Sequence, residues 1–235
     1  RALGEAEANK RLVAASSAPE RTSPFGVPED QVFPMGDWVG GRFSVWASPG
    51  LSVEIALGPD VWSAFLAGAR EMDEHVETAP MAENLASCLA LADVWNASAL
   101  DCPARAVLPY AHRLSLLPFH LQQLEMESNG KSFSPDGGLA ERAASPVVFG
   151  LAGTVGQHSF YQLLHQGVPE VVCEFIAVLN EGGDRKRNAG LLANCLAQAK
   201  ILAIGRTIEA VANELRQKGV AEHEILELAP QKAMP

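Results

Sequence analysis

The stretch that decides the fold is ARAVLPYAHRLSLLPFHLQQLEME, residues 104–127. Its first part, residues 104–110, is an apolar run with the length of a buried strand. Residues 114–126 then show the spacing of apolar positions that is typical of an amphipathic helix, with Glu127 at its end. A buried strand followed by a covering helix is the repeating step of parallel sheets, so the stretch predicts an α/β fold.

The helix is expected to end directly after Glu127. Residues 128–131 read SNGK, and an Asn-Gly pair tolerates the left-handed backbone conformation that closes many helices. A carboxylate at this point is fixed by the helix on one side and open on the other, as a general base for a carbon acid is usually presented. A solvated glutamate near a helix end is the simpler interpretation of this stretch by itself.

Other apolar segments alternate with helical patterns on both sides of this step. Short strands are expected at residues 12–16, 31–35, 146–150 and 171–179, and the one at residues 12–16 is expected to be buried. Helices are expected at residues 49–57, 61–76, 81–97, 159–165, 188–205, 207–218 and 221–226. The alternation predicts a parallel sheet covered on both faces, a three-layer α/β/α sandwich that the chain contains incompletely. Residues 1–58 are expected to finish one domain, and residues 59–235 to form most of a second.

Single residues complete this picture of the helices. Asp60 and Thr207 are expected to cap the helices that follow them, because their side-chain oxygens can accept from free N–H groups. Trp62, Phe65 and Trp95 are expected in the core.

The composition excludes several classes of function. The chain of 235 residues is 48% hydrophobic and has a net charge of −10, which is typical of a soluble globular protein without a large basic surface for nucleic acid or anionic lipid. No apolar run approaches the roughly 20 residues that span a bilayer, and the N-terminus has neither a signal-peptide core nor an initiator Met. A cytoplasmic location follows as the expectation, and the missing Met indicates a fragment.

The four cysteines are expected to be buried free thiols. Cys88, Cys102, Cys173 and Cys195 stand in apolar surroundings without the spacing of a zinc site or a redox motif. Neither a metal nor another cofactor is expected.

Two glycine-containing turns could let a ligand approach the backbone. Gly41 follows another glycine and precedes Arg42, where a guanidinium and backbone N–H groups could converge on an anionic oxygen. The strand at residues 146–150 runs into a second glycine turn that ends in His158, at the predicted start of a helix. Free N–H groups there would oppose protonation of the imidazole, and a neutral His158 can exchange a proton with a sugar hydroxyl. An exposed arginine and a structural histidine are the alternatives.

Three separated motifs occur in the order that is found in one family. The segments DWVGGRFSVWASPGLS (residues 37–52), LQQLEMESNGK (residues 121–131) and GTVGQHSFYQLLHQG (residues 153–167) resemble those of glucose-6-phosphate isomerases. LPY at residues 108–110 and LLANCLAQ at residues 191–198 are similar to that family too, so the resemblance covers nearly the whole chain. It implies the sugar-isomerase fold, two unequal α/β/α domains with parallel sheets, assembled as a homodimer with a shared active site.

The resemblance also implies roles for five residues in the interconversion of glucose 6-phosphate and fructose 6-phosphate. Glu127 matches the base that moves a proton between C1 and C2 through a cis-enediol, and Arg42 matches the residue that stabilises negative charge on that intermediate. His158 matches the ring-opening residue, which in the family comes from the neighbouring subunit. Gly41 and Gln123 match positions that line the sugar. Proton abstraction beside a carbonyl needs such a carboxylate, an oxyanion stabiliser and a separate acid or base for ring opening, and no metal.

Parts of the family pattern are altered or absent. The usual WGEPGTNGQH reads FGLAGTVGQH at residues 149–158, and the His-His pair before LLAN reads Arg187-Asn188. The Ser/Thr-rich phosphate loop and the QxGVExxK segment with its catalytic lysine do not occur in these residues. Negligible isomerase activity is therefore expected of the chain alone. A non-catalytic sugar-phosphate-binding module, a structural fragment without a ligand, and the isomerase part of a bifunctional fusion enzyme stay open as alternatives, although Glu127 argues against the first.

Overall fold

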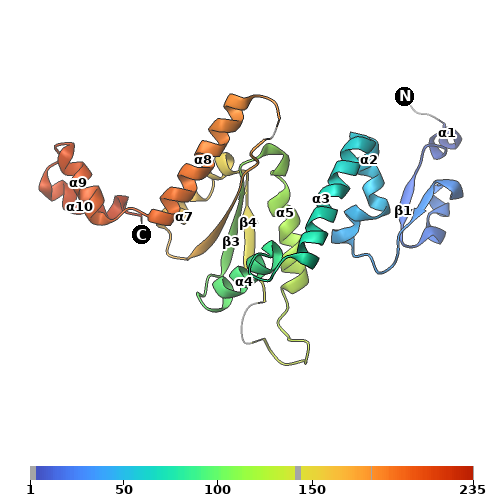
Figure 1. Cartoon of the computed structure of the whole chain (residues 1–235), viewed down its shortest axis with the longest axis horizontal. Helices are drawn as coiled ribbons and strands as arrows, with labels where there is room; N and C mark the ends of the chain where they lie inside the picture. Colours follow the sequence, from blue (N-terminus) through green and yellow to red (C-terminus); the bar gives the residue numbers. More distant parts are fainter. Residues whose placement is uncertain (1–3, 141–143, 181, 235) are drawn as a thin grey trace. The chain divides into compact units, whose positions relative to one another are not determined.

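In this computed structural model the residues described are 4–140, 144–180 and 182–234. The chain divides into two compact units, Arg1–Ala90 and Leu91–Pro235 (Figure 1). The domain boundary expected after residue 58 falls inside the first unit. It concerns the division between two sugar-isomerase domains, and it stays a prediction.

The first unit combines a small parallel sheet with helices. Its elements are α1 (Glu5–Asn9), β1 (Ala14–Ser16), β2 (Val32–Pro34), α2 (Leu51–Leu57) and α3 (Pro59–Thr78), and α4 (Leu85–Ser98) runs across the division between the units. β1 and β2 pair in parallel with Ala14 opposite Val32, where the sequence predicts strands. The expected burial of β1 is wrong, since Ala15 is exposed; a sheet of two strands covers few of its own residues.

The aromatic residues of α3 and α4 do not form the expected core. Phe65 is 41% exposed and Trp95 is 62% exposed, and no side chain on the described helices α3 and α4 is buried. Trp62 and Trp46 instead stack on Phe65, with ring centroids 5.6 and 4.6 Å apart respectively. The expectation was wrong because a large apolar side chain is buried only where a second surface packs against it.

The start of α3 also differs from the expectation. The helix begins at Pro59 after Gly58, so Asp60 lies inside the first turn and is not the cap. Proline suits this position because the first N–H of a helix has no partner within the helix. The carboxylate of Asp60 still lies near the positive end of the helix dipole.

The second unit is built on a three-stranded parallel sheet. β3 (Ala104–Pro109) lies between β4 (Val147–Gly150) and β5 (Val171–Ile176), with Ala104 opposite Val147 on one side and Val171 on the other. All three strands occur where the sequence predicts them, and the parallel α/β fold is confirmed. β3 is the buried strand because both of its edges are paired, and Ala106, Val107 and Leu108 have no exposed surface.

Helices cover the two faces of this sheet, as three layers require. On one face Ala106, Leu108 and Tyr110 pack with Tyr161 of α7 (Tyr161–Gln166) and Cys195 of α8 (Arg185–Ile204). On the other side of the sheet lies α5 (Leu117–Leu121), as Figure 1 shows. Successive strand residues point to opposite faces, so Arg105 and Val107 belong to the α5 side.

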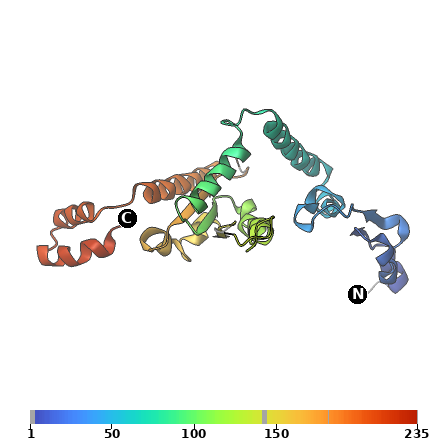
Figure 2. The same ribbon diagram turned by 90° about the horizontal axis from the view of Figure 1, so that it is seen from below.

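The chain continues from α8 into a helical hairpin. α9 (Ile208–Gln217) and α10 (Glu222–Lys232) lie side by side (Figure 2) and bury a small core of Val211, Ala212, Leu215, Ile225 and Ala229. The predicted cap of α9 is confirmed, because Thr207 Oγ1 accepts a hydrogen bond from the Ala210 N–H at 3.1 Å. α10 extends six residues beyond the predicted end at 226, because Ala229 packs into the hairpin core.

The cysteines differ in their exposure. All four thiols are free. Cys102 and Cys195 are buried as expected and Cys173 is half-buried, but Cys88 is exposed, on helix α4. Burial raises the pKa of Cys173 to about 11, and it raises the pKa of Cys102 and Cys195 as well.

Candidate functional site

The segment that carries Gln123 and Glu127 is not the continuous α-helix that the apolar pattern predicts. α5 ends at Leu121, and a π-helical turn, Gln122–Glu127, follows it directly. A π-helical turn places one extra residue in the turn and therefore redirects the side chains that follow. Such turns occur often at functional sites, so the candidate base lies in a local geometry of that kind.

One side of the π-helical turn is fastened to the sheet. Gln122 Nε2 donates to the Val148 carbonyl of β4 at 3.0 Å, and the Val148 N–H donates to Met126 Sδ at 3.2 Å. Between these two contacts Glu125 forms an ion pair with Arg105 of β3. The three contacts fix the rotation of the turn about its own axis.

The opposite side of the turn presents the two predicted site residues. Gln123 and Glu127 are four residues apart and both are exposed, whereas Gln122, Glu125 and Met126 are half-buried. Residues four apart on a helix lie one above the other on the same face. The structure therefore brings Gln123 and Glu127 together on one accessible face.

The π-helical turn ends with hydrogen bonds from Lys131 and with a close contact between the backbones of Gly130 and Met126. Lys131 Nζ donates to the backbone carbonyls of Glu127 and Ser128 at 2.8 and 3.0 Å, so a cation satisfies acceptors at a helix C-terminus. The expected left-handed conformation is wrong, because neither Asn129 nor Gly130 has a positive φ. Gly130 is needed for another reason: a Cβ there would collide with the Met126 carbonyl oxygen, which accepts from the Gly130 N–H at 2.9 Å.

His158 follows β4, but its surroundings differ from the prediction. A short helix, α6 (Gly153–Gly156), starts directly after the strand, and His158 lies in the turn between α6 and α7. Its backbone N–H donates to the Val155 carbonyl at 3.1 Å. The predicted free N–H groups of a helix start are therefore not at His158, because the helix begins one turn earlier. The side chain of His158 is exposed.

Two buried tyrosines support this turn. The hydroxyl oxygens of Tyr110 and Tyr161 lie 2.9 Å apart, within hydrogen-bond distance, and burial raises the pKa of both phenols. The hydrogen bond with Tyr161 opposes the rise in the pKa of Tyr110. A Cβ at Gly153 would collide with the Tyr110 ring, so this glycine lets the turn pack directly on β3. The tyrosine pair thereby ties the end of β3 to Tyr161, the first residue of α7, directly after the turn that carries His158.

Gly41 and Arg42 belong to the first unit. Gly41 begins a 3₁₀ turn, Gly41–Trp46, in which Ser44 Oγ donates to the Gly41 carbonyl at 2.8 Å. Arg42 is half-buried and Gly41 is exposed. These two residues therefore lie in a different unit from Gln123, Glu127 and His158.

Two of the cavities in the second unit are lined by residues that the structure describes. One of about 340 Å³ lies at the carboxyl ends of β3 and β4, where open α/β sheets bind ligands, and its lining includes His112, Thr154, Arg187 and Asn194. Arg187 stands where the related pattern has a histidine, and it gives this cavity a cationic wall.

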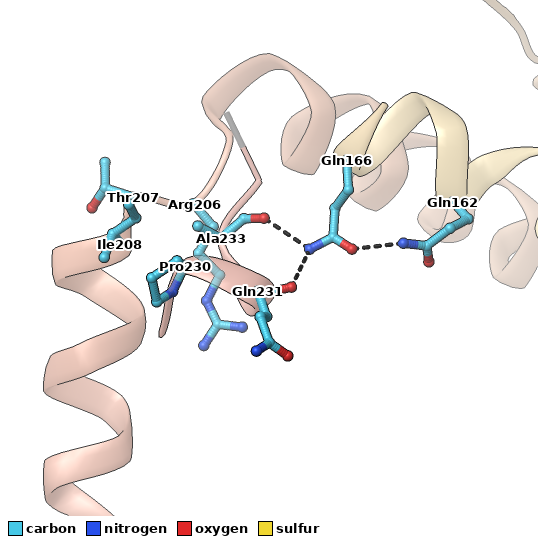
Figure 3. A pocket seen from close by; sticks show the side chains of 8 residues that line it. All are labelled: Gln162, Gln166, Arg206, Thr207, Ile208, Pro230, Gln231 and Ala233. Atoms are coloured by element: carbon cyan, nitrogen blue, oxygen red, sulfur yellow. Dashed lines mark hydrogen bonds between the residues drawn. The ribbon is translucent and has the colours of Figure 1, made fainter. Parts of the chain in front are cut away.

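The second cavity, of about 680 Å³, lies between α7 and the hairpin (Figure 3). There Gln166 Nε2 donates to the carbonyls of Gln231 and Ala233 at 2.9 and 2.8 Å, and Gln162 Nε2 donates to Gln166 Oε1 at 2.6 Å. None of the five predicted site residues lines either of these two cavities. Its contacts fasten the hairpin to α7.

Arg105 is the residue that the sequence interpretation missed. A charged side chain near the start of a strand that is otherwise buried was the available signal, because buried charges are retained only with partners.

Two further findings concern the described residues as a whole. The described residues contain no group of three or more His, Cys, Asp or Glu side chains that could hold a metal ion. Likewise, no helix within those ranges has the length and apolar character needed to cross a bilayer.

The fold and the site define an α/β protein with a parallel sheet, in which a carboxylate on a π-helical turn and a histidine after a strand are the candidate acid–base groups. The family model described as phosphoglucose isomerase matches residues 1–235. The chain belongs to the phosphoglucose isomerase family.

Individual relatives agree with this assignment. The chain is 49% identical over 232 residues to a glucose-6-phosphate isomerase of Caulobacter vibrioides, covering 98% of this chain and 43% of the relative. It is 45% identical over 236 residues to that of Xanthobacter autotrophicus, covering 100% and 43%. Among solved structures, a glucose-6-phosphate isomerase of Chlamydia trachomatis is similar with a TM-score of 0.73 and 34% identity, over 83% of this chain and 46% of that one. The chain thus spans less than half the length of these relatives.

Proposed function

We propose that the full-length polypeptide carrying these residues is an aldose–ketose isomerase that interconverts glucose 6-phosphate and fructose 6-phosphate through a cis-enediol. Family membership and the names of the relatives support the substrate. The observation that carries the proposal is the π-helical turn, which is fastened to the sheet on one side and presents Gln123 and Glu127 on the other. A general base must combine a fixed position with access to substrate.

Each predicted residue has one role in this proposal. Glu127 takes the proton from C2 or C1 as general base, and Gln123, on the same face, binds a sugar hydroxyl. Arg42 stabilises the negative charge of the enediol, with Gly41 allowing the sugar to approach the backbone. His158 opens the sugar ring by moving a proton between the ring oxygen and the C1 hydroxyl. No step requires a metal or another cofactor.

The organisation of the whole protein is part of the proposal. Residues 1–58 complete a first sugar-isomerase domain and residues 59–235 form most of a second. Two copies assemble as a homodimer in the cytoplasm, and His158 of each serves the active site of the other. The protein binds neither nucleic acid nor membrane, in keeping with a net charge of −10. The 235 residues alone have negligible activity, because the phosphate loop and the lysine segment of the family pattern are not among them.

The test compares Glu127→Gln with a matched control in a polypeptide of the length of the relatives. Glu227→Gln removes the same charge from an exposed position on α10, and it should leave turnover unchanged. Glu127→Gln should lower kcat on the order of 10²–10⁴-fold, the usual contribution of a general base, with the Kd for fructose 6-phosphate within about 3-fold.

Other results would separate the alternatives. A wild-type protein that binds fructose 6-phosphate without turning it over would favour the non-catalytic binding module. A protein that neither binds nor converts the sugar phosphate would favour the structural alternative. Rapid turnover by Glu127→Gln would assign the proton transfer to another group.

A further inference from the structure

Arg105 lies at the centre of a buried cluster of charges. It projects from the middle strand of the sheet and is only 4% exposed. Three carboxylates surround its guanidinium: Asp93 of α4 at 2.6 Å from Nη1, Glu125 of the π-helical turn beside Nη2, and Glu174 of β5 at 3.7 Å from Nε. One cation thus links four elements of the second unit.

The guanidinium keeps its charge in this position. Burial by itself would lower the pKa of Arg105, but the carboxylates of Glu125 and Asp93 outweigh it and raise that pKa. A charged group that is withdrawn from water depends on its partners, and removing one partner leaves the other poorly compensated. The planar guanidinium also offers its N–H groups in fixed directions, so each carboxylate is held at a defined angle.

Of the three carboxylates, Glu125 is the one that connects Arg105 to the candidate base. Glu125 and Glu127 belong to the same π-helical turn and are two residues apart. Side chains two residues apart on a helix point to nearly opposite sides. Holding Glu125 against the sheet therefore turns Glu127 away from the sheet, and any rotation of the turn would move both.

The other contacts that hold the π-helical turn against the sheet are weaker than the ion pair between Arg105 and Glu125. Gln122 donates a neutral hydrogen bond, and Met126 accepts through sulfur, which is a weak acceptor. Charge-assisted hydrogen bonds are roughly twice as strong as neutral ones. The contact between Arg105 and Glu125 is thus the strongest of the three that set the rotation.

We infer that Arg105 is a positioning residue for the proposed isomerisation, because it holds Glu125 and thereby directs the Glu127 carboxylate toward the substrate. The inference rests on the proposed function of Glu127, and it adds that Arg105 and Glu125 together orient the carboxylate of this base. A base displaced by about 1 Å can lose on the order of 10²-fold in rate.

The structure offers a matched pair of variants on the same guanidinium. Glu125→Gln and Asp93→Asn each replace one partner carboxylate of Arg105 by an amide of the same size. Both should lower the melting temperature, because each leaves the buried cation with one charge fewer around it. Only Glu125 lies on the π-helical turn, so only its replacement should change the chemistry at Glu127.

The experiment measures kcat, KM and the melting temperature in a polypeptide of the length of the relatives. Glu125→Gln should lower kcat by about 10- to 100-fold with KM within about 3-fold, the pattern of an interaction made in the transition state. Asp93→Asn should keep kcat within about 2-fold of wild type at a similar loss of melting temperature. Glu125→Asp keeps the charge but shortens the side chain, so it should fold even if Glu125→Gln does not, and it should also lower kcat.

The outcomes separate the inference from the function on which it rests. If wild type is active and Glu127→Gln is not, but Glu125→Gln and Glu125→Asp turn over normally, the positioning role is wrong and the proposed function stands. Equal losses of kcat in Glu125→Gln and Asp93→Asn would make the cluster a purely structural one. If wild type does not isomerise, or Glu127→Gln stays active, the proposed function fails first.

Discussion

The hydrogen bond between Tyr110 and Tyr161 predicts a measurable coupling between the sheet and the turn that carries His158. Tyr110 and Tyr161 are each only 3% exposed, and their hydroxyl oxygens are 2.9 Å apart. Replacing either tyrosine by phenylalanine leaves the remaining hydroxyl buried without this partner, which costs about 1–3 kcal/mol. Replacing both removes two polar groups together, and such a change is nearly neutral.

The two single variants and the double variant form a cycle that isolates this interaction. Urea unfolding of the 235-residue chain is the assay, with the midpoint as the observable. At a slope of about 2 kcal/mol per M, each single variant should shift the midpoint downward by about 0.5–1.5 M. The double variant should stay close to the wild-type midpoint, so it should be less destabilised than the sum of the singles by about 2–6 kcal/mol.

Two results of this cycle would refute the reasoning. Strictly additive single changes would mean that the two hydroxyls do not interact. Single changes below about 0.3 kcal/mol would mean that water replaces the lost partner, so that the pair is not buried. Phe149→Leu, on β4 in the same cluster, is the packing control, and it should show no coupling to the hydroxyl of either tyrosine beyond about 0.5 kcal/mol.

Three other predictions concern stability and reactivity. Thr207→Ala should destabilise the α9–α10 hairpin by about 1 kcal/mol through loss of the cap, measured by urea unfolding, whereas Thr207→Ser should retain it; equal stability of both would contradict the cap. Burial raises the pKa of Glu174, with Arg105 opposing the rise and neighbouring acids adding to it, so folding loses stability as the pH rises through that raised value. The melting temperature of Glu174→Gln relative to wild type should therefore be higher at pH 7 than near pH 4, where the wild-type carboxyl is protonated, and a relative melting temperature that falls between pH 4 and pH 7 would refute the sign. Iodoacetamide should label Cys88 of the native chain before the other cysteines, as peptide mass spectrometry can show; faster labelling of Cys195 would contradict the burial pattern.

The strands of the second unit could be predicted because their pattern is local. Residues 104–110, 146–150 and 171–179 are apolar runs of strand length, and each contains the strand that the structure has there. The N-cap at Thr207 was predictable for the same reason, because a cap depends on residues only three positions apart.

The π-helical turn could not be predicted from its own residues. Residues 114–126 carry the apolar spacing of an ordinary helix, and the turn depends on contacts with residues distant in the sequence. Gln122 and Met126 meet Val148 of β4, and Glu125 meets Arg105 of β3. Contacts of this kind override local preference, and they turn the face of the helix toward the sheet.

The prediction that His158 lies at the start of a helix was wrong for a different reason. The sequence shows a glycine turn and then an apolar run, and it does not show which residue starts the helix. In the structure a helix starts at Gly153, where only glycine fits against the Tyr110 ring. The exposure of Phe65 and Trp95 could not be predicted either, because the sequence does not show whether another surface packs against an aromatic side chain.

The central claim is that Glu127 moves the proton, and isotope exchange tests it most directly. The full-length polypeptide is incubated with fructose 6-phosphate in D₂O, and deuterium at C2 of the glucose 6-phosphate formed is measured by NMR. We predict incorporation with wild type and none with Glu127→Gln, while equilibrium dialysis shows that the variant still binds fructose 6-phosphate. Incorporation by Glu127→Gln at the wild-type rate would contradict the account.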